Sequence, residues 1–408
     1  MISIEGVKAA AAALDGVARK TDLIEGHERG AGKGVYLKTE NLQATGSFKL
    51  RGAYYKISTL TDEEKQAGII ACSAGNHAQG VALAAGKMGI PCVICMPDGA
   101  PISKVEATRA LGAEVILVPG SYDDAYHYAS QIQEKTGATL IHPFDDERVI
   151  EGQATIGLEI LEQLPDVDTI VVPVGGGGLI AGLAFAAKSI NPDIKVYGVQ
   201  AQNAPCVYER LRNADAAPLG SVATFADGIA VKVPGEITLD LIREYVDEVV
   251  TVSDDEIATA VLSLMEKEKL ISEGAGATSV AAVLFDKLPL SATSSGDTKT
   301  VCVVSGGNID VNILSRVITR GLVTSGRSAT LHIALEDKPG QLSKVSNIIS
   351  DCGGNVVQVY HSGSDPAMAI TSCNLTVGLE TRDHDHVQEI KDALRHAGLQ
   401  LVNSPGAN

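Results

Sequence analysis

Hydrophobic and polar positions along the first three quarters of the chain alternate between short apolar runs and longer segments with helical spacing. Runs such as 169–174 are almost continuously apolar, which is typical of strands buried on both faces of a parallel sheet. The longer segments repeat apolar residues every three or four positions, as amphipathic helices do. The pattern predicts an α/β fold whose ligands bind at loops leaving the carboxyl ends of strands. The expected strands are 68–72, 91–95, 114–118, 140–142, 169–174, 195–200 and 300–305, and the expected helices 80–88, 104–111, 123–136, 151–163 and 179–189.

The pattern of hydrophobic and polar residues changes near residues 319–328, a short polar stretch with glycines that is typical of a linker. We therefore expect a main part over 1–320 with a smaller lobe at about 53–155, a linker at 321–328 and a separate tail over 329–404. The tail predicts the order βαββαβ, the ferredoxin-like arrangement. Its elements are expected at 329–336, 341–352, 355–361, 369–379, 383–396 and 399–403, with a turn at 337–340.

Composition and net charge limit the kinds of partner that this protein can bind. The chain has 408 residues, of which 45% are hydrophobic and 20% charged, and its formal net charge is −17. Such a chain is apolar enough to fold, and its negative charge argues against nucleic acid and against an anionic membrane surface as partners. A small molecule is the expected partner.

Seven scattered cysteines, an odd number, are typical of reduced and buried thiols in a cytoplasmic protein. Cys92 and Cys95 form a C-x-x-C within a predicted strand, which would place them on opposite faces, and no second pair completes a zinc site. The N-terminus predicts a helix and lacks the features of a signal peptide. The uncharged stretch 169–187 is long enough for a membrane helix, but Pro173 and Gly175–178 interrupt it.

The clearest chemical motif is a strand followed by Gly175, Gly176, Gly177 and Gly178, then a helix that begins near Leu179. Backbone N–H groups at a helix N-terminus, free of side chains, form a phosphate cradle. The spacing also fits the dinucleotide pattern G-x-G-x-x-A. The acidic residue that this pattern expects about 20 positions later is absent, since the next strand ends in Gln-Ala-Gln. A phosphate site is therefore favoured over an NAD site.

A lysine stands in an unusual place in the segment 40–53. Thr45, Gly46 and Ser47 can cap a helix that begins near Phe48, which puts Lys49 in its first turn. The helix dipole disfavours a cation there, and a positive local field favours the neutral amine that attacks carbonyls. A solvated surface lysine is the alternative interpretation.

Two further strand ends carry small polar turns. Ser73, Ala74, Gly75, Asn76 and His77 present donors where a carboxylate could bind, and Ser305 follows a buried strand as a single hydroxyl. Each turn alone could be structural. A lysine, a phosphate loop and two polar turns together suit pyridoxal phosphate, which needs a Schiff-base lysine, a phosphate site, a partner for its ring nitrogen and support for its phenolic oxygen.

These motifs resemble the fold-type II pyridoxal-phosphate enzymes, which have two open-sheet α/β lobes, and closely the threonine dehydratase (threonine ammonia-lyase) group over residues 5–320. The resemblance implies that Lys49, next to Phe48, is the catalytic Schiff-base lysine and that residues 175–179 bind the cofactor phosphate. It implies Ser305 at the ring nitrogen and Asn76 at the phenolic oxygen. Residues 73–77 would bind the substrate carboxylate. The implied reaction is β-elimination of threonine, and of serine, to a 2-oxo acid and ammonia.

The tail resembles an ACT domain, a regulatory module that commonly binds amino acids between paired copies. The resemblance makes 337–340 its signature turn and implies an amino-acid effector near Asp337, Gly340, Gln341, Leu342 and Asn355. It also implies a homodimer or homotetramer.

Several alternatives stay open. In serine racemases of this fold a second serine occupies the position of Ala74, and the methyl group has no proton to give, which argues for a dehydratase. A β-replacement enzyme, an NAD-dependent oxidoreductase and a non-catalytic amino-acid sensor are less favoured, the last because Lys49 is intact. Asp227 resembles one carboxylate of a cation site in the racemases, although a turn is the preferred interpretation and no metal is expected. Glu273, at a predicted helix start, could contact the site.

Overall fold

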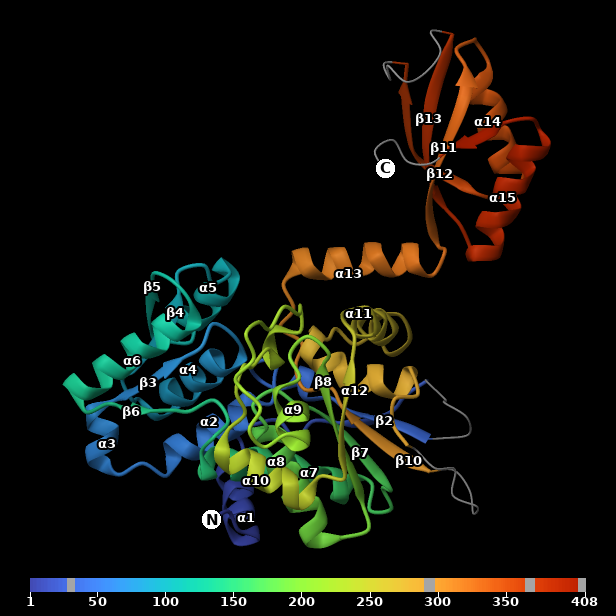
Figure 1. Ribbon diagram of the computed structural model, residues 1–408. Helices are drawn as coiled ribbons and strands as arrows, with labels where there is room; N and C mark the ends of the chain where they lie inside the picture. The colour runs from blue at the N-terminus through green and yellow to red at the C-terminus, as the bar shows by residue number, and fades with distance from the viewer. Residues whose placement is uncertain (28–33, 290–297, 364–370, 403–408) are drawn as a thin grey trace. The chain divides into compact units, whose positions relative to one another are not determined.

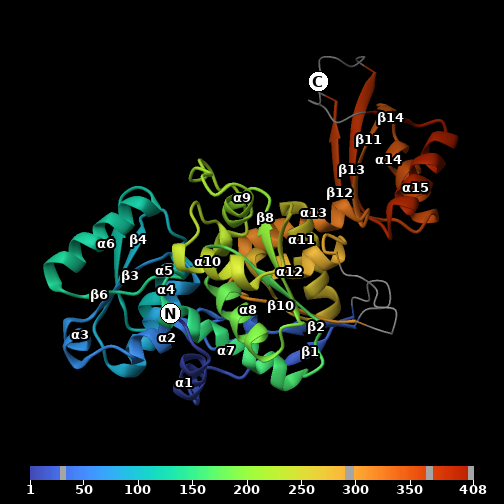
Figure 2. The ribbon, with the colours of Figure 1, turned by 60° about the horizontal axis from the view of Figure 1, so that its bottom comes forward.

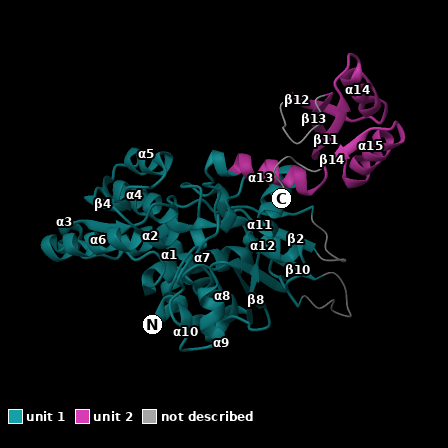
Figure 3. Ribbon diagram, turned by 45° about the horizontal axis from the view of Figure 1, so that its top comes forward, with its two compact units in different colours: residues 1–313 teal, residues 314–408 magenta. Residues whose placement is uncertain are grey.

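The computed structural model describes residues 1–27, 34–289, 298–363 and 371–402. The chain divides into two compact units, Met1–Ile313 and Leu314–Asn408 (Figure 3). The boundary falls inside helix α13 (Val311–Thr324), so residues 321–324 of the expected linker are helical. The reason is apolar spacing at residues 311, 314, 317, 318 and 322, which continues a helical pattern past the glycine at 321.

Strands and helices alternate through much of the first unit (Figure 1). They are α1 (Ile4–Leu14), β1 (Leu23–Glu25), β2 (Gly34–Lys38), η1 (Glu40–Leu42), α2 (Lys49–Ser58), α3 (Asp62–Ala67), β3 (Ile69–Cys72), α4 (Asn76–Met88), β4 (Cys92–Pro97), α5 (Ile102–Ala110), β5 (Glu114–Val118), α6 (Tyr122–Thr136), β6 (Thr139–Leu140), α7 (Glu147–Gln163), β7 (Thr169–Pro173), α8 (Gly178–Ile190), β8 (Lys195–Ala201), α9 (Cys206–Arg212), η2 (Asp227–Ile229), α10 (Glu236–Tyr245), β9 (Glu248–Val252), α11 (Asp254–Ser263), η3 (Leu264–Glu268), α12 (Gly274–Leu284) and β10 (Lys299–Val303).

The larger sheet has the strand order β1-β2-β10-β7-β8-β9, and every pair except β1–β2 is parallel. All five residues of β7 are buried, as expected for a strand covered on both faces. Helices α7, α8 and α10 lie on one side of this sheet and α11 and α12 on the other (Figure 2). The main core packs α7 and α8 against β7, β8 and β10. The predicted parallel α/β architecture is confirmed.

The smaller sheet is entirely parallel, in the order β5-β4-β3-β6. Two apolar clusters cover its faces: one packs α2, α4 and α5 against it, and the other packs α6. Cys92 belongs to the first cluster and Cys95 to the second, which confirms that the two thiols face opposite sides. All seven cysteines are free.

Some boundaries differ from the sequence pattern for local reasons. The strand expected at 140–142 ends at Leu140, because the ring of His142 accepts the backbone N–H groups of Phe144 and Asp145 and turns the chain. Helix α7 begins four residues earlier than expected, where Asp146 caps it. The short strands β1, β2 and β9, of three to five residues, are additional to those expected from the sequence.

The second unit contains β11 (Ser328–Glu336), α14 (Gln341–Asp351), β12 (Asn355–Ser362), β13 (Ser372–Glu380), α15 (His384–His396) and β14 (Gln400–Val402). Its sheet is antiparallel, in the order β12-β13-β11-β14. The apolar side chains of β11 and β13 pack with α14 and α15 in one core. This is the predicted βαββαβ arrangement; Ala369 and Asn403, at the ends of two expected strands, lie outside the described residues. Across the described part of the chain, no helix is both long and apolar enough to span a membrane.

Candidate active site

A cavity of about 870 Å³ lies in the first unit, where loops from both sheets converge. This volume is within the range of small-molecule and cofactor sites. Each cofactor and substrate residue predicted from the sequence contributes to its lining: Phe48, Lys49, Ser73, Ala74, Gly75, Asn76, His77, Gly175, Gly176, Gly177, Gly178, Leu179 and Ser305. The structure thus brings together segments that are more than 200 residues apart.

Lys49 is the first residue of α2, and its side chain is half-buried in the cavity wall. Phe48 occupies the N-cap position in a helical conformation without a side-chain cap, so the expected cap by residues 45–47 is wrong. The ammonium donates a hydrogen bond to the carbonyl of Pro143 over 2.8 Å and lies 5.2 Å from the Phe48 ring centre. Burial lowers the pKa of Lys49 to about 8, against the opposing attraction of Glu273. A neutral amine is therefore accessible near physiological pH.

The four-glycine loop joins β7 to the start of α8. Gly177 has φ of +102°, a conformation that favours glycine. A Cβ on Gly176 would lie 2.5 Å from the Phe144 ring, and one on Gly178 would lie 2.8 Å from the Phe144 carbonyl oxygen. The carbonyl of Gly176 accepts a hydrogen bond of 2.6 Å from the Thr238 hydroxyl. The loop is thus a fixed backbone surface beside the free N–H groups of a helix N-terminus, which attract anions.

The turn from β3 to α4 carries the predicted carboxylate loop. The hydroxyl of Ser73 accepts the N–H of Gly75 over 3.1 Å, which holds the turn before Asn76 opens the helix. His77 is buried, and burial together with the charge of Lys49 lowers its pKa to about 3. Its neutral ring therefore donates Nε2–H to the carbonyl of Ile141 over 2.8 Å. Helix α4 approaches the backbone of α2 closely at Gly80, where a Cβ would lie 3.0 Å from the main chain of Lys49. This close packing keeps the loop beside the lysine.

Asn76 is held from two sides by side chains of distant segments. Its Nδ2 donates to Glu273 Oε1 over 2.6 Å, and its Oδ1 accepts from Asn308 Nδ2 over 2.8 Å. Asn308 Nδ2 also donates to the carbonyl of Thr45 over 2.7 Å. This series of hydrogen bonds fixes the orientation of the Asn76 amide and leaves it one unused N–H for a ligand.

Glu273 lies at the N-cap of α12 and is only 4% exposed. Burial raises its pKa to about 7, with a further contribution from Asp227, while the hydrogen bond from Asn76 acts in the opposite direction. Glycines at 306 and 228 make room for this carboxylate, because a Cβ on either would approach Glu273 Oε1 to 2.4 or 3.2 Å. Glu273 also lines the cavity, beside the residues that we expect to bind the cofactor.

Ser305 follows β10 and is 3% exposed at the cavity. Its carbonyl accepts the N–H of Phe48 over 3.2 Å, which connects the end of β10 to the lysine segment. The hydroxyl of Ser305 and the amine of Lys49 thus lie on neighbouring main-chain segments.

Sequence reasoning missed the segment His142–Phe144, which also lines the cavity. Pro143 receives the hydrogen bond from Lys49, and Phe144 packs against the glycine loop. This segment follows the carboxyl end of β6, so the rule that located the other loops could have located it as well.

Asp227 also lines the cavity, at its exposed side, and forms an ion pair with Lys104. The carboxylate of Asp227, which resembles a cation ligand of the racemases, is thus paired with the ammonium group of Lys104. We therefore read Asp227 as a partner of Lys104.

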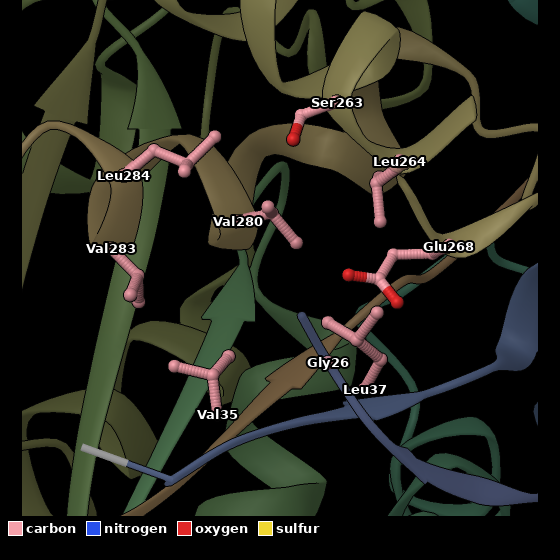
Figure 4. A pocket seen from close by; sticks show the side chains of 9 residues that line it. All are labelled: Gly26, Val35, Leu37, Ser263, Leu264, Glu268, Val280, Val283 and Leu284. Carbon is pink, nitrogen blue, oxygen red and sulfur yellow. The ribbon is translucent and has the colours of Figure 1, made fainter. Parts of the chain in front are cut away.

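A second, very small cavity of about 10 Å³ lies between β2, α11 and α12 (Figure 4). Its lining is mostly apolar, with the carboxylate of Glu268 among Val35, Val280 and Leu284. The carboxylate accepts the backbone N–H of His27 over 2.7 Å. The space is about that of one water molecule, so it is not a ligand site.

The residues that we expect to bind an effector lie in the second unit. Gly340, with φ of +91°, precedes α14, whose first residues are Gln341 and the exposed Leu342. Asp337 follows β11, and Asn355 opens β12, where its amide donates to Glu380 over 2.8 Å.

Comparison with known proteins agrees with this site. A family model described as "Pyridoxal-phosphate dependent enzyme" matches residues 14–306. The chain is 49% identical to L-threonine ammonia-lyase of Thermotoga maritima over 98% of this chain and 99% of that protein. Among solved structures, maize serine racemase superposes with a TM-score of 0.73 at 37% identity, covering 79% of this chain and 98% of that one. The processed form of tomato threonine deaminase isoform 2 gives 0.72 at 38% identity, covering 77% and 87%.

The chain therefore belongs to the pyridoxal-phosphate-dependent enzymes of fold type II, in the branch that contains the L-threonine ammonia-lyases. It is an enzyme, and its cofactor is pyridoxal 5'-phosphate.

The described residues fit this cofactor. A lysine with a lowered pKa faces the cavity, and the glycine loop offers a helix N-terminus in which side chains at two positions would collide with Phe144. A phosphate is held by backbone N–H groups in such a loop, which accords with a chain whose net charge is −17.

Proposed function

We propose that this protein catalyses β-elimination of L-threonine, and of L-serine, to 2-oxobutanoate or pyruvate and ammonia. The observation that carries the proposal is the convergence of Lys49, the glycine loop, the loop 73–77 and Ser305 on one cavity. The similarity to threonine ammonia-lyases over nearly the whole chain supports the substrate class.

Lys49 would hold the cofactor through its aldehyde, and the N–H groups of Gly176–Leu179 would hold its phosphate. Asn76 would donate its second N–H to the phenolic oxygen, and Ser305 would face the ring nitrogen. When bound, the cofactor supplies a conjugated ring that stabilises negative charge at the α-carbon of the substrate.

Lys49 would also move protons at the α-carbon of the substrate. Its lowered pKa leaves a neutral amine, whose Nζ would accept the proton from the α-carbon of the substrate. The β-hydroxyl departs as water, and a water molecule is consumed when ammonia is released. The net reaction thus converts one hydroxyamino acid into one 2-oxo acid and one ammonia.

The loop 73–77 would orient the substrate through its carboxylate, using N–H groups at the start of α4. Ala74 lines the cavity without a proton donor of its own. A second candidate function, serine racemisation, is supported by the structural similarity to maize serine racemase. We favour elimination because racemisation needs an acid on each face of the substrate, and Ala74 cannot be one.

The second unit would serve as an ACT-type regulatory module that binds an amino-acid effector near Asp337, Gly340, Gln341, Leu342 and Asn355. Its ferredoxin-like sheet supports this assignment. We further propose a homodimer or homotetramer in the reducing cytoplasm, in accord with seven free cysteines.

Steady-state kinetics test the proposal. The purified enzyme, saturated with cofactor, is supplied separately with L-threonine and L-serine, and 2-oxo acid and ammonia are quantified together. Equal molar yields of the two products support elimination. Appearance of D-serine without 2-oxo acid would instead establish the racemase alternative. Repeating the assay with a panel of amino acids tests regulation, since a regulatory module predicts that at least one changes the rate.

A further inference from the structure

Three side chains with metal-binding atoms meet in the second unit, outside the cavity described above. They are Asp337, His361 and Cys373, and their carboxylate oxygen, ring nitrogen and sulfur all lie within 4.8 Å of one another. The carboxylate and the ring are exposed, whereas the cysteine is 1% exposed.

The strand register explains why these three residues meet. β13 lies between β12 and β11, with Leu375 opposite His361 and Cys373 opposite Leu335. Because side chains alternate along a strand, His361 shares the face of Leu375, and therefore of Cys373 two positions away. The N–H of Asp337 donates to the carbonyl of Thr371 over 2.9 Å, which continues the β11–β13 pairing one residue beyond β11. Asp337 thus takes the same face as residue 335, and each of three adjacent strands supplies one ligand atom.

The combination of donors selects a particular class of cation. Thiolate, imidazole and carboxylate together suit a borderline-soft divalent ion, and zinc accepts all three. Zinc bonds of about 2.0–2.3 Å in tetrahedral geometry place ligand atoms about 3.5 Å apart. Rotation of the exposed Asp337 and His361 side chains about their own bonds can close the remaining distance. The neighbouring cation, Lys338, is engaged by Glu336 at 2.7 Å.

We propose that Asp337, His361 and Cys373 form a zinc-binding site in the C-terminal unit, with a fourth position for water or a small-molecule donor. The ion would connect β11, β13 and β12 beside the turn 337–340. The site is separate from the proposed catalytic cavity, so it stands or falls independently of the proposed catalytic reaction. It shares Asp337 with the proposed effector site.

Binding requires that the cysteine lose its proton to solvent as the zinc–sulfur bond forms. Zinc must therefore compete with a proton, and affinity should rise with pH.

Cobalt is the probe for this site, because tetrahedral cobalt with a thiolate ligand has visible bands and a sulfur-to-metal charge-transfer band. The full-length enzyme with its cofactor is treated with a thiol reductant so that its cysteines are reduced, and a chelator then removes any metal. The protein is titrated with Co²⁺, and zinc is added afterwards to displace the cobalt. We expect about one equivalent of tetrahedral cobalt per chain, displaced by zinc.

Four variants locate the ligands. Cys373→Ser should remove the sulfur band, and His361→Gln and Asp337→Asn should weaken cobalt binding by about tenfold or more. Cys352→Ser changes a half-buried cysteine of the same unit outside the cluster and should bind as the unchanged chain does. His361 and Asp337 are exposed, so their replacement should leave folding intact, which a melting curve verifies. The proposal is overturned if the unchanged enzyme gives no tetrahedral cobalt spectrum, or if His361→Gln and Asp337→Asn both retain its affinity.

Discussion

Replacing Glu273 by glutamine should stabilise the protein against heat at neutral and alkaline pH, and progressively less as the pH falls. Glu273 is 4% exposed, and burial raises its pKa from 4.5 to about 7. A raised pKa means that the folded protein resists ionisation of this group, whereas the unfolded chain ionises freely. Protonated Glu273 therefore contributes its full stabilisation of the folded state below about pH 4.5. This stabilisation is lost as the pH rises through about 7.

The magnitude follows from the shift. A difference of about 2.5 pH units at about 1.36 kcal/mol per unit corresponds to roughly 3 kcal/mol of folding free energy. Glutamine has no charge to bury, and its side-chain oxygen can still accept the hydrogen bond from Asn76. The variant should therefore gain most of this free energy above about pH 7 and little below about pH 4.5.

Melting temperatures of the cofactor-loaded protein at about pH 5 and about pH 8 provide the assay. The difference between Glu273→Gln and the unchanged chain should be several degrees larger at the higher pH. Asp227, Lys104 and Lys49 also face this carboxylate, so both proteins are measured in the same buffers. Glu114→Gln, a change at an exposed position of β5, should give the same difference at both pH values. A difference for Glu273→Gln that does not grow with pH would refute the argument from burial.

Three further changes test other parts of the site and core. Gly176→Ala would place a methyl group 2.5 Å from the Phe144 ring, and the overpacking, about 1–3 kcal/mol, should weaken cofactor binding about 5- to 150-fold in an equilibrium titration. Ala74→Ser should add some racemase activity, measured as D-serine formed from L-serine by chiral chromatography. Glu40→Gln removes a buried carboxylate that pairs with Arg51 at 2.7 Å, and should destabilise the protein by about 3 kcal/mol, seen as a lower melting temperature.

Each of these changes has an outcome that would contradict its reasoning. Gly99 has open space around it, so Gly99→Ala should bind cofactor normally. If Gly176→Ala and Gly99→Ala lost cofactor affinity equally, a clash with Phe144 would not explain the loss. Recovered serine of unchanged stereochemistry would count against the role assigned to position 74. An unaltered melting temperature for Glu40→Gln would show that Glu159, the other partner of Arg51, is sufficient.

The loops of the site could be predicted because a short sequence pattern of its own marks each of them. A buried apolar run such as β7 must end, and glycines or small polar residues at that end have few roles other than a tight turn or a ligand contact. The same local signals predicted the order of elements in the second unit. Helix dipole arguments predicted an unusual lysine at residue 49, although the residue that caps its helix differs from the expected one.

Long-range pairing could not be predicted in this way. β2 completes the larger sheet only by pairing with β10, more than 250 residues away, and its own sequence is too short and too mixed to reveal this. The contacts of Asn76 with Glu273 and Asn308 depend on three segments meeting, which no single window of sequence contains. The raised pKa of Glu273 likewise arises from burial that only the folded chain provides.

The central claim is that Lys49 carries both cofactor attachment and proton transfer, and replacement by alanine tests it most directly. Lys49→Ala should lose the visible absorbance band of the attached cofactor and lower 2-oxo acid formation from L-threonine by about 10³-fold or more. Lys56→Ala, on the same helix but paired with Asp146 at 2.7 Å, should keep the band and the activity. A Lys49→Ala protein that retains the absorbance band and full turnover would contradict the account.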